Sequence, residues 1–285
     1  MRKLVLAFVV LWGCAAPGTA AEIPVPGPYL PPAPPLAVPL YSWTGCHGGV
    51  NIGGGASPKS WTDTDGTFFP DEPGAPLGTH TARGVAGGWQ LGCDYQAGAF
   101  VFGLEGRYDL SGMKADNLQP NSIFLNNSFI QTVGMWTARV GYTVTPTVLL
   151  YGKAGGALVH DLYNVSTQPG VTQGLLSTPP FFKPCSGNLG GIFTPPCVGF
   201  EPGYIVALGA NTKVGWTLGA GLEWALYYSN WSLFLEYDYM NFGTSQVPFA
   251  LTITPGGFFP LDIKQSVNMV LVGMNWRFWG GNRHY

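Results

Sequence analysis

Hydrophobic and polar residues alternate one by one over long stretches of this chain. The clearest stretch is residues 269–278. One of its faces carries Val270, Val272, Met274, Trp276 and Phe278. The other face carries Leu271, Gly273, Asn275 and Arg277. Strict alternation over this length predicts a β-strand whose two faces meet unlike surroundings.

The same alternation recurs earlier in the chain, and each recurrence predicts another strand. The segments are residues 44–55, 84–96, 100–110, 135–144, 148–159, 213–226 and 231–242. In the sixth of them, for example, Trp216 and Leu218 alternate with Thr217 and Gly219. With the last stretch, the pattern predicts eight strands.

The connections between these segments alternate in length. Short connections lie around residues 96–99, 145–147 and 227–230. Long connections cover residues 56–83, 111–129, 160–212 and 243–266. Short turns at one end and long loops at the other are typical of an outer-membrane β-barrel.

Aromatic residues gather near both ends of the predicted strands. Near the short turns are Tyr95, Phe100, Tyr142, Trp224, Trp231 and Phe278. Toward the long loops are Trp136, Trp216, Tyr239 and Phe242. Two such sets indicate aromatic girdles at the two lipid–water boundaries.

Composition decides which way the apolar faces point. Only 10% of the residues are charged, against roughly 25% in average proteins, and 42 are glycine. A soluble up-and-down barrel or sandwich would carry a charge-rich outer face. Here the polar face is rich in glycine and poor in charge, which suits a crowded interior. We therefore predict an all-β fold, an eight-stranded antiparallel up-and-down transmembrane β-barrel.

The N-terminal segment has the layout of a secretory signal. Arg2 and Lys3 precede a short apolar run, and small residues follow, so that cleavage after Ala20 or Ala21 is expected. A lipoprotein site at Cys14 is the alternative, although bulky Trp12 fits it poorly. Outside this segment no run of about 18 apolar residues predicts a transmembrane helix.

We predict four parts: a signal peptide (1–21), a Pro-rich periplasmic spacer (22–41), the outer-membrane barrel (42–278) and a short C-terminal tail (279–285).

Net charge excludes one class of partner. Removal of the signal leaves 11 basic and 15 acidic side chains, a formal charge of −4. Nucleic-acid binding needs a basic face, so no nucleic-acid partner is expected.

Several short motifs, taken together, resemble a known family. They include Ser42-Trp43-Thr44-Gly45, Gly88-Trp89-Gln90-Leu91-Gly92, Phe102-Gly103-Leu104-Glu105-Gly106 and Val272-Gly273-Met274-Asn275-Trp276-Arg277-Phe278. Their order and spacing resemble the alphaproteobacterial outer-membrane β-barrel family of porin-like surface antigens, whose architecture is like that of the OmpA membrane domain.

The resemblance implies a surface protein that supports envelope integrity or contacts a host or ligand through its loops. It implies both termini in the periplasm. Outer-membrane lipid, lipopolysaccharide and the barrel-assembly machinery are the implied partners. Gly273, Trp276 and Phe278 resemble the assembly signal in the last strand, although residues 279–285 extend beyond the usual terminal aromatic residue.

Charged residues on the polar faces form the candidate site in the lumen. They are Glu105, Arg107, Asp109, Arg139, Lys153, Glu223, Glu236, Asp238 and Arg277. Side chains fill the interior of an eight-stranded barrel, so we expect a paired network that satisfies buried charge. The alternative is a narrow ion or small-solute path gated by these pairs. A general diffusion pore needs about 16 strands.

The histidines give little support for catalysis. His47 is expected to face the lumen, His80 and His160 to lie at loops, and His284 in the tail. No serine motif accompanies them, so we predict neither an enzyme nor a cofactor. Two alternatives stay open: lipid-modifying catalysis by His160 beside Asp161, and haem or metal binding by His80 and His160.

Four cysteines remain after signal removal. Cys185 and Cys197 bracket part of one long loop, where a disulfide is expected. Cys46 and Cys93 share the outward parity on neighbouring strands, and they form a disulfide only if the register places them opposite each other. Otherwise they are small lipid-facing residues. No metal site is expected, because no close ligand spacing occurs.

Overall fold

The computed structural model describes residues 41–66, 73–119, 124–168, 203–252 and 256–279. Each strand pairs antiparallel with the next, and the last pairs with the first to close a barrel. The strands are β1 (Gly45–Asp63), β2 (Pro76–Ala97), β3 (Phe100–Leu118), β4 (Phe124–Thr145), β5 (Val148–Thr167), β6 (Ile205–Ala225), β7 (Trp231–Leu251) and β8 (Phe258–Trp279). The predicted fold class is confirmed. In the described part of the chain, no helix is long and apolar enough to cross a membrane.

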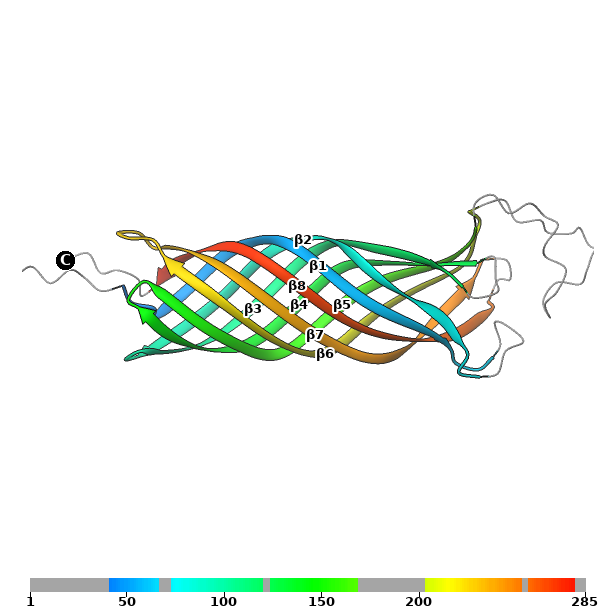
Figure 1. Ribbon diagram of the computed structural model, residues 1–285, viewed down its shortest axis with the longest axis horizontal. Helices are drawn as coiled ribbons and strands as arrows, with labels where there is room; N and C mark the ends of the chain where they lie inside the picture. The colour runs from blue at the N-terminus through cyan, green and yellow to red at the C-terminus, as the bar shows by residue number, and fades with distance from the viewer. Residues whose placement is uncertain (1–40, 67–72, 120–123, 169–202, 253–255, 280–285) are drawn as a thin grey trace, which may run out of the picture. The chain divides into compact units, whose positions relative to one another are not determined.

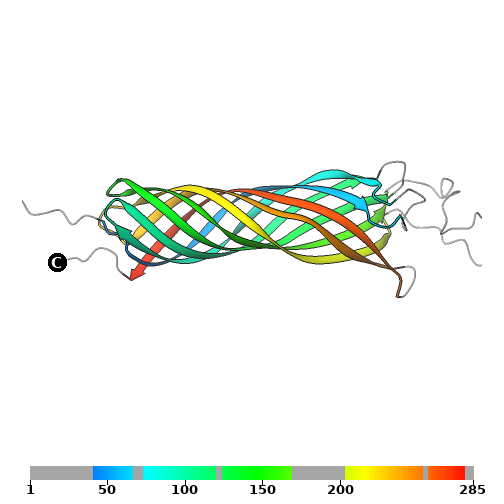
Figure 2. The same ribbon diagram turned by 90° about the horizontal axis from the view of Figure 1, so that it is seen from below.

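The strands run obliquely around the barrel, as both views show (Figures 1 and 2). β1 begins, and β8 ends, at the end of the barrel that carries the tight β2–β3, β4–β5 and β6–β7 connections. We call this the short-turn end and the opposite one the loop end. The predicted signal peptide, the spacer up to residue 40 and the tail from residue 280 lie outside the described residues.

An apolar belt surrounds the outside of the barrel from the short-turn end to just beyond its middle. Its side chains are 50–69% exposed and include Ile52, Leu91, Leu104, Val140, Leu150, Leu235 and Val272. All of the aromatic residues predicted for the short-turn girdle are exposed. Phe242, predicted for the other girdle, is instead buried in the lumen, because it shares the inward parity of Met240.

The strands continue far into the segments predicted as long loops, so those boundaries were wrong. β1 reaches Asp63, and β8 already begins at Phe258, for example. The connections that remain are residues 64–75, 119–123, 168–204 and 252–257. Only the third of these is long, and most of it lies outside the described residues.

Beyond the belt the polarity of the two strand faces is reversed: the outward residues become mainly polar and the inward residues mainly apolar. On β8, Val270 and the outward residues after it are apolar and exposed, whereas the outward residue Lys264 is charged. Its inward side changes at the same point, from Asn275 and Arg277 to Leu271 and Ile263. Beyond the belt the interior is therefore mainly apolar and the outer wall mainly polar, as in a soluble barrel. Leu118, Leu208 and Phe258 near the loop end are exposed apolar exceptions.

Side chains fill the interior in stacked layers. Near the short-turn end, Tyr41, Trp43 and Leu149 belong to one apolar cluster. A layer of buried charged groups follows. The next layer is apolar and holds Ala82, Ala86, Met113, Ile130, Val133, Met135, Ala157, Val159, Met240, Phe242, Val267, Met269 and Leu271. Above it lie a few buried polar groups and a second apolar cluster that includes Trp61, Phe249 and Ile263.

The side chains of the central apolar layer come from β2, β3, β4, β5, β7 and β8. β1 and β6 contribute glycines at this level, and each glycine makes room for a large neighbour. A Cβ on Gly55 would lie 2.6 Å from the Met113 sulfur, and a Cβ on Gly215 would lie 2.9 Å from a ring carbon of Phe242. We call this layer the apolar plug.

Candidate functional site

The nine charged residues predicted for the lumen are all buried there, and most of them meet in one network. Lys153 Nζ lies 2.6 Å from Glu236, 3.3 Å from Glu105 and 3.4 Å from Asp238. Arg107 pairs with Glu236 and Asp238, and its Nε lies 3.1 Å from Asp109. Opposite charges in direct contact offset the cost of removing each group from water.

A second part of the network lies nearer the short-turn end. Arg139 Nε donates to Asp94 at 2.7 Å, and its Nη1 lies 3.0 Å from Glu223. Arg277 Nη2 lies 3.1 Å from the same Asp94, and its Nη1 donates to the backbone carbonyl of Trp43 at 2.6 Å. The network therefore also holds Trp43, a buried member of the apolar cluster near the short-turn end.

Sequence reasoning left two members out of this set. Asp94 had the correct parity but was not counted among the lumen charges, although it accepts from both Arg139 and Arg277. His47, which was expected in the lumen, lies between Asp94 at 3.3 Å and Glu105 at 3.7 Å. Parity along β2 was the signal that identifies Asp94.

A smaller polar cluster lies between the plug and the loop-end apolar cluster. Lys59 pairs with Asp161 at 2.7 Å, and Gln265 donates to the same carboxylate at 3.3 Å. Lys213 donates to the backbone carbonyl of Ile263 at 3.1 Å. Lys59 lies beyond the belt, and burial lowers its pKa although Asp161 opposes the shift. Lys59, Asp161 and Gln265 fall within segments predicted as loops, and Lys213 is the first residue of a predicted strand, so the sequence analysis missed the cluster.

The two histidines considered for haem, metal or catalysis point to opposite sides of the wall. His80 is on the inner wall, where Nδ1 and Nε2 hydrogen bond with Asn117 at 2.6 Å and Ser128 at 2.7 Å. His160 is on the outer wall, 2.8 Å from Thr212. Asp161, the predicted partner of His160, faces the lumen and binds Lys59. These side chains therefore do not converge on one site, and no cluster of three metal-ligating residues occurs among those described.

The register decides between the two expectations for Cys46 and Cys93. They lie directly opposite each other on β1 and β2, and a disulfide joins them. Cys185 and Cys197 lie outside the described residues.

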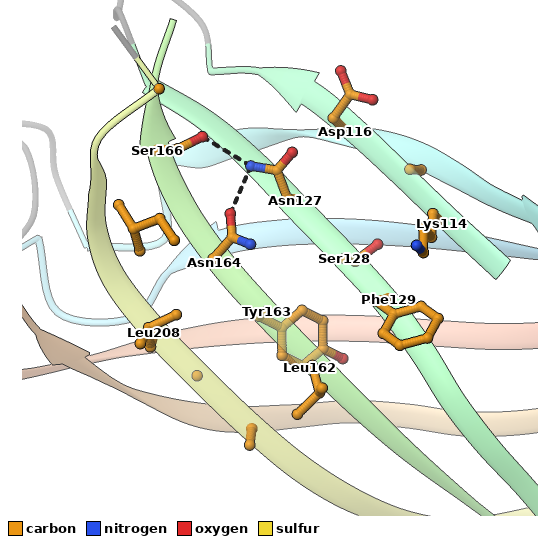
Figure 3. Close-up of a pocket in the computed structure, with 15 residues that line it drawn as sticks. Lys114, Asp116, Asn127, Ser128, Phe129, Leu162, Tyr163, Asn164, Ser166 and Leu208 are labelled. Atoms are coloured by element: carbon orange, nitrogen blue, oxygen red, sulfur yellow. Dashed lines mark hydrogen bonds between the residues drawn. The ribbon is translucent and has the colours of Figure 1, made fainter. Parts of the chain in front are cut away.

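A groove on the outer wall lies beyond the belt, across β3, β4, β5 and β6 (Figure 3). It has a volume of about 970 Å³. Asn127 donates hydrogen bonds to Asn164 at 2.7 Å and to Ser166 at 3.0 Å. Phe129 and Leu162 form the side of the groove toward the belt. The groove thus combines a polar amide cluster with an apolar side formed by Phe129 and Leu162. Sequence reasoning missed it, because its residues lie in segments predicted as loops.

Comparison with known families agrees with this architecture. Residues 32–278 match the family described as "Outer membrane protein beta-barrel domain". The chain belongs to this family. It is an outer-membrane β-barrel surface protein, as the resemblance implied.

The relatives of this outer-membrane barrel include surface antigens of Brucella. The "31 kDa outer-membrane immunogenic protein" of Brucella melitensis is 27% identical over 98% of this chain and 100% of its own length. The "25 kDa outer-membrane immunogenic protein" of Brucella ovis is 28% identical over 85% of this chain and 90% of its own length.

Solved structures that resemble the barrel are more distant. Ail, the attachment invasion locus protein of Yersinia pestis, is 13% identical over 82% of this chain and 99% of its own, with a TM-score of 0.35. The outer-membrane protease OmpT of Escherichia coli is 8% identical over 84% and 98%, with a TM-score of 0.46. The evidence for a closed barrel is therefore the strand pairing of this chain itself, in which β8 pairs with β1.

The last strand of this outer-membrane barrel carries the residues expected to form an assembly signal. Trp276 and Phe278 are exposed on the outer face of β8 and lie against each other, with ring centroids 5.9 Å apart. Gly273 leaves space for the ring of Phe234 on the neighbouring strand. Their role in assembly stays a prediction.

Proposed function

We propose that this protein is a closed-lumen surface protein, which supports the envelope and contacts molecules outside the cell through its loop end. The observation that carries the proposal is the reversal of polarity between the inner and outer faces of the strands beyond the belt. Beyond the belt, the barrel continues with a mainly polar outer wall around a mainly apolar interior. A wall of this kind presents a rigid surface to the medium, whereas a pore would need polar groups along the whole lumen.

The plug argues against the alternative of an ion or solute path. The charged network contains groups that an ion could follow, but Met113, Phe242 and Leu271 interrupt it with an apolar layer. Moving a bare ion through such a layer costs several kcal/mol or more.

Planar-bilayer recording tests the closed lumen. The full chain is expected to give no conductance steps after insertion. The double variant Met113→Gly and Phe242→Gly removes two large side chains from the plug, and we expect it to conduct. Its conductance also serves as a control that the recording detects barrels inserted in the bilayer. Discrete openings of the unmodified protein would contradict the closed lumen.

The proposal includes no catalytic step. Because His160 and Asp161 lie on opposite faces, they cannot act as an acid–base pair on one substrate. The lipid A profile of a deletion strain is expected to match the wild type. A difference restored by the intact gene but not by a His160→Gln variant would contradict this view.

The proposed orientation places both termini in the periplasm and the loop end outside. Even-numbered antiparallel strands bring the start of β1 and the end of β8 to one side. An epitope inserted in residues 64–75 should bind antibody on intact cells, whereas one after Tyr285 should bind only after permeabilisation. The reverse result would invert the orientation.

The envelope role is tested in a deletion strain. We expect increased sensitivity to detergent and reduced attachment to host cells or matrix, each restored by the complete chain. Unchanged detergent sensitivity and attachment would refute the proposed role while leaving the barrel itself intact.

A further inference from the structure

Two cations lie side by side on the outer wall just beyond the belt. Arg83 of β2 and Lys114 of β3 are register partners, and both are exposed. Cβ atoms of such a pair are about 4.5–5.5 Å apart, and like charges at this separation destabilise a sheet. The arrangement therefore carries an energetic cost unless an anion lies between the two groups.

Neither cation has an ion pair among the described residues. Lys114 instead lies over the ring of its register partner Phe129, with Nζ 4.9 Å from the ring centroid. The ring restrains the ammonium group on the outer wall and contacts one side of it. Asp116, two residues farther along β3, is the carboxylate nearest in sequence on this face, and no ion pair joins it to Lys114.

The position along the barrel indicates the kind of anion. Val85 and Leu110, on the same two strands, belong to the outer part of the belt and are 70% and 63% exposed. Arg83 is the next outward residue after Val85, so the pair lies where acyl chains give way to headgroups. On the far side of Phe129, its register partner Leu162 leads into the groove and its amide cluster (Figure 3).

We propose that Arg83 and Lys114 bind a phosphate group of a phosphorylated glycolipid in the outer leaflet. This inference rests on the proposed orientation of the barrel. The phosphate lies between the guanidinium and ammonium groups, the acyl chains follow the belt below, and the sugar extends over Phe129 toward Asn127 and Asn164. A guanidinium group binds phosphate through paired charge-assisted hydrogen bonds, which an isolated surface lysine does not supply.

Native mass spectrometry of the full chain in detergent micelles tests the site. The probes are bisphosphorylated lipid A, its dephosphorylated form and free glucosamine phosphate. We expect the first to bind at least roughly tenfold more tightly than the other two. Arg83→Gln and Lys114→Gln should each weaken it by roughly tenfold, which corresponds to about 1.4 kcal/mol.

Lys264→Gln is the matched control. Lys264 is also exposed on the outer wall beyond the belt, but its register partners are Ser60 and Thr244, so no second cation lies opposite. Its loss should change binding by less than about twofold. Heat-modifiable migration first establishes that each variant is a folded barrel. Three results would overturn the proposal: lipid A binds no more tightly than its dephosphorylated form, it binds no more tightly than glucosamine phosphate, or all three variants lose the same affinity. None of these results affects the proposed orientation, which the epitope experiment tests separately.

Discussion

At the scale of single residues, glycines on the inner wall make room for the charged network. Gly103 is the register partner of Asp94, and a Cβ there would overlap the Asp94 carboxylate and lie 3.1 Å from Cγ of Arg139. Both groups are held by their mutual ion pair and cannot move apart without weakening it. Gly88 and Gly219 make room in the same way for Asp109 and Asp238.

Gly103→Ala should therefore lower the free energy of unfolding by about 1–3 kcal/mol, as overpacking commonly does. Gly106→Ala is the control on the same strand, because a Cβ added there points outward and would meet no atom of another strand within 4 Å. Urea unfolding in lipid vesicles measures both. Equal stability of the two variants would show that the network tolerates the added methyl group.

His80 gives the loop end a dependence on pH. Burial lowers the pKa of His80, although its hydrogen bond with Asn117 opposes the shift. The folded state therefore favours the neutral ring, and its stabilising contribution is present above the unfolded pKa of about 6.5. That contribution is lost as the pH falls from about 6.5 through the lower folded pKa.

We expect an NMR titration to place the pKa of His80 below about 6.5. Amide exchange in the outer parts of β2, β3 and β4 should accelerate as the pH falls from about 7 to about 5, after correction for the intrinsic rate. In His80→Gln this acceleration should be absent. A pKa at or above the ordinary value would contradict the buried neutral ring.

At the scale of strands, the disulfide joins β1 and β2 close to the short-turn end. Cys46 and Cys93 are 47 residues apart in sequence, so the bond closes a long loop in the unfolded chain. In the chain-entropy account such a bond contributes about 2–4 kcal/mol.

Replacing both cysteines with alanine should lower the free energy of unfolding by about this amount. Reductant should destabilise the original protein in urea but leave the double variant unchanged. Peptide mapping without reduction should recover residues 46 and 93 in one linked fragment. Recovery of two separate fragments would contradict the pairing.

The sequence predicted the strands only as far as the belt extends. Inside the belt, apolar residues point outward, and alternation such as that of Val270 and Leu271 onward is unmistakable. Beyond the belt the alternation continues, but the apolar residues now point inward and the polar residues outward, as Ile263 and Lys264 illustrate. An apolar outward face marks a strand in the sequence only inside the belt, so the sequence pattern predicts loops where the faces are reversed.

The same limit applied to the candidate site. Parity alone identified Glu105, Arg139 and the other lumen charges of the belt region. The pairing of Lys59 with Asp161 joins residues 102 positions apart on β1 and β5. No local pattern gives that contact, because it depends on how far each strand is displaced around the closed barrel.

At the scale of the whole molecule, lipid surrounds the belt, and water surrounds the part of the barrel beyond it. Leu235 lies in the belt and has Leu222 and Val272 as register partners. Gln246 lies on the outer wall of the same strand beyond the belt and has Asp262 as its partner. The two positions share a strand and a face but differ in their surroundings.

Leu235→Arg should cost about 2–4 kcal/mol in phospholipid vesicles, because a charge at the middle of the lipid layer is poorly solvated. Gln246→Arg should cost less than about 1 kcal/mol. Urea unfolding in vesicles compares the two. Equal costs would mean that the belt and the outer wall meet the same medium.

The most direct test of the reversal of polarity beyond the belt is the solvent around these two positions. A nitroxide is attached to a cysteine introduced by Leu235→Cys or Gln246→Cys. The vesicle-inserted chain has its signal peptide removed, Cys185 and Cys197 replaced by serine, and Cys46 and Cys93 kept in their disulfide, so the introduced cysteine is the one free thiol. Spin relaxation by oxygen, which concentrates in lipid, should dominate at 235, and relaxation by a water-soluble nickel chelate should dominate at 246. Strong nickel relaxation at position 235 would contradict the lipid-facing belt, and strong oxygen but weak nickel relaxation at 246 would contradict the polar outer wall.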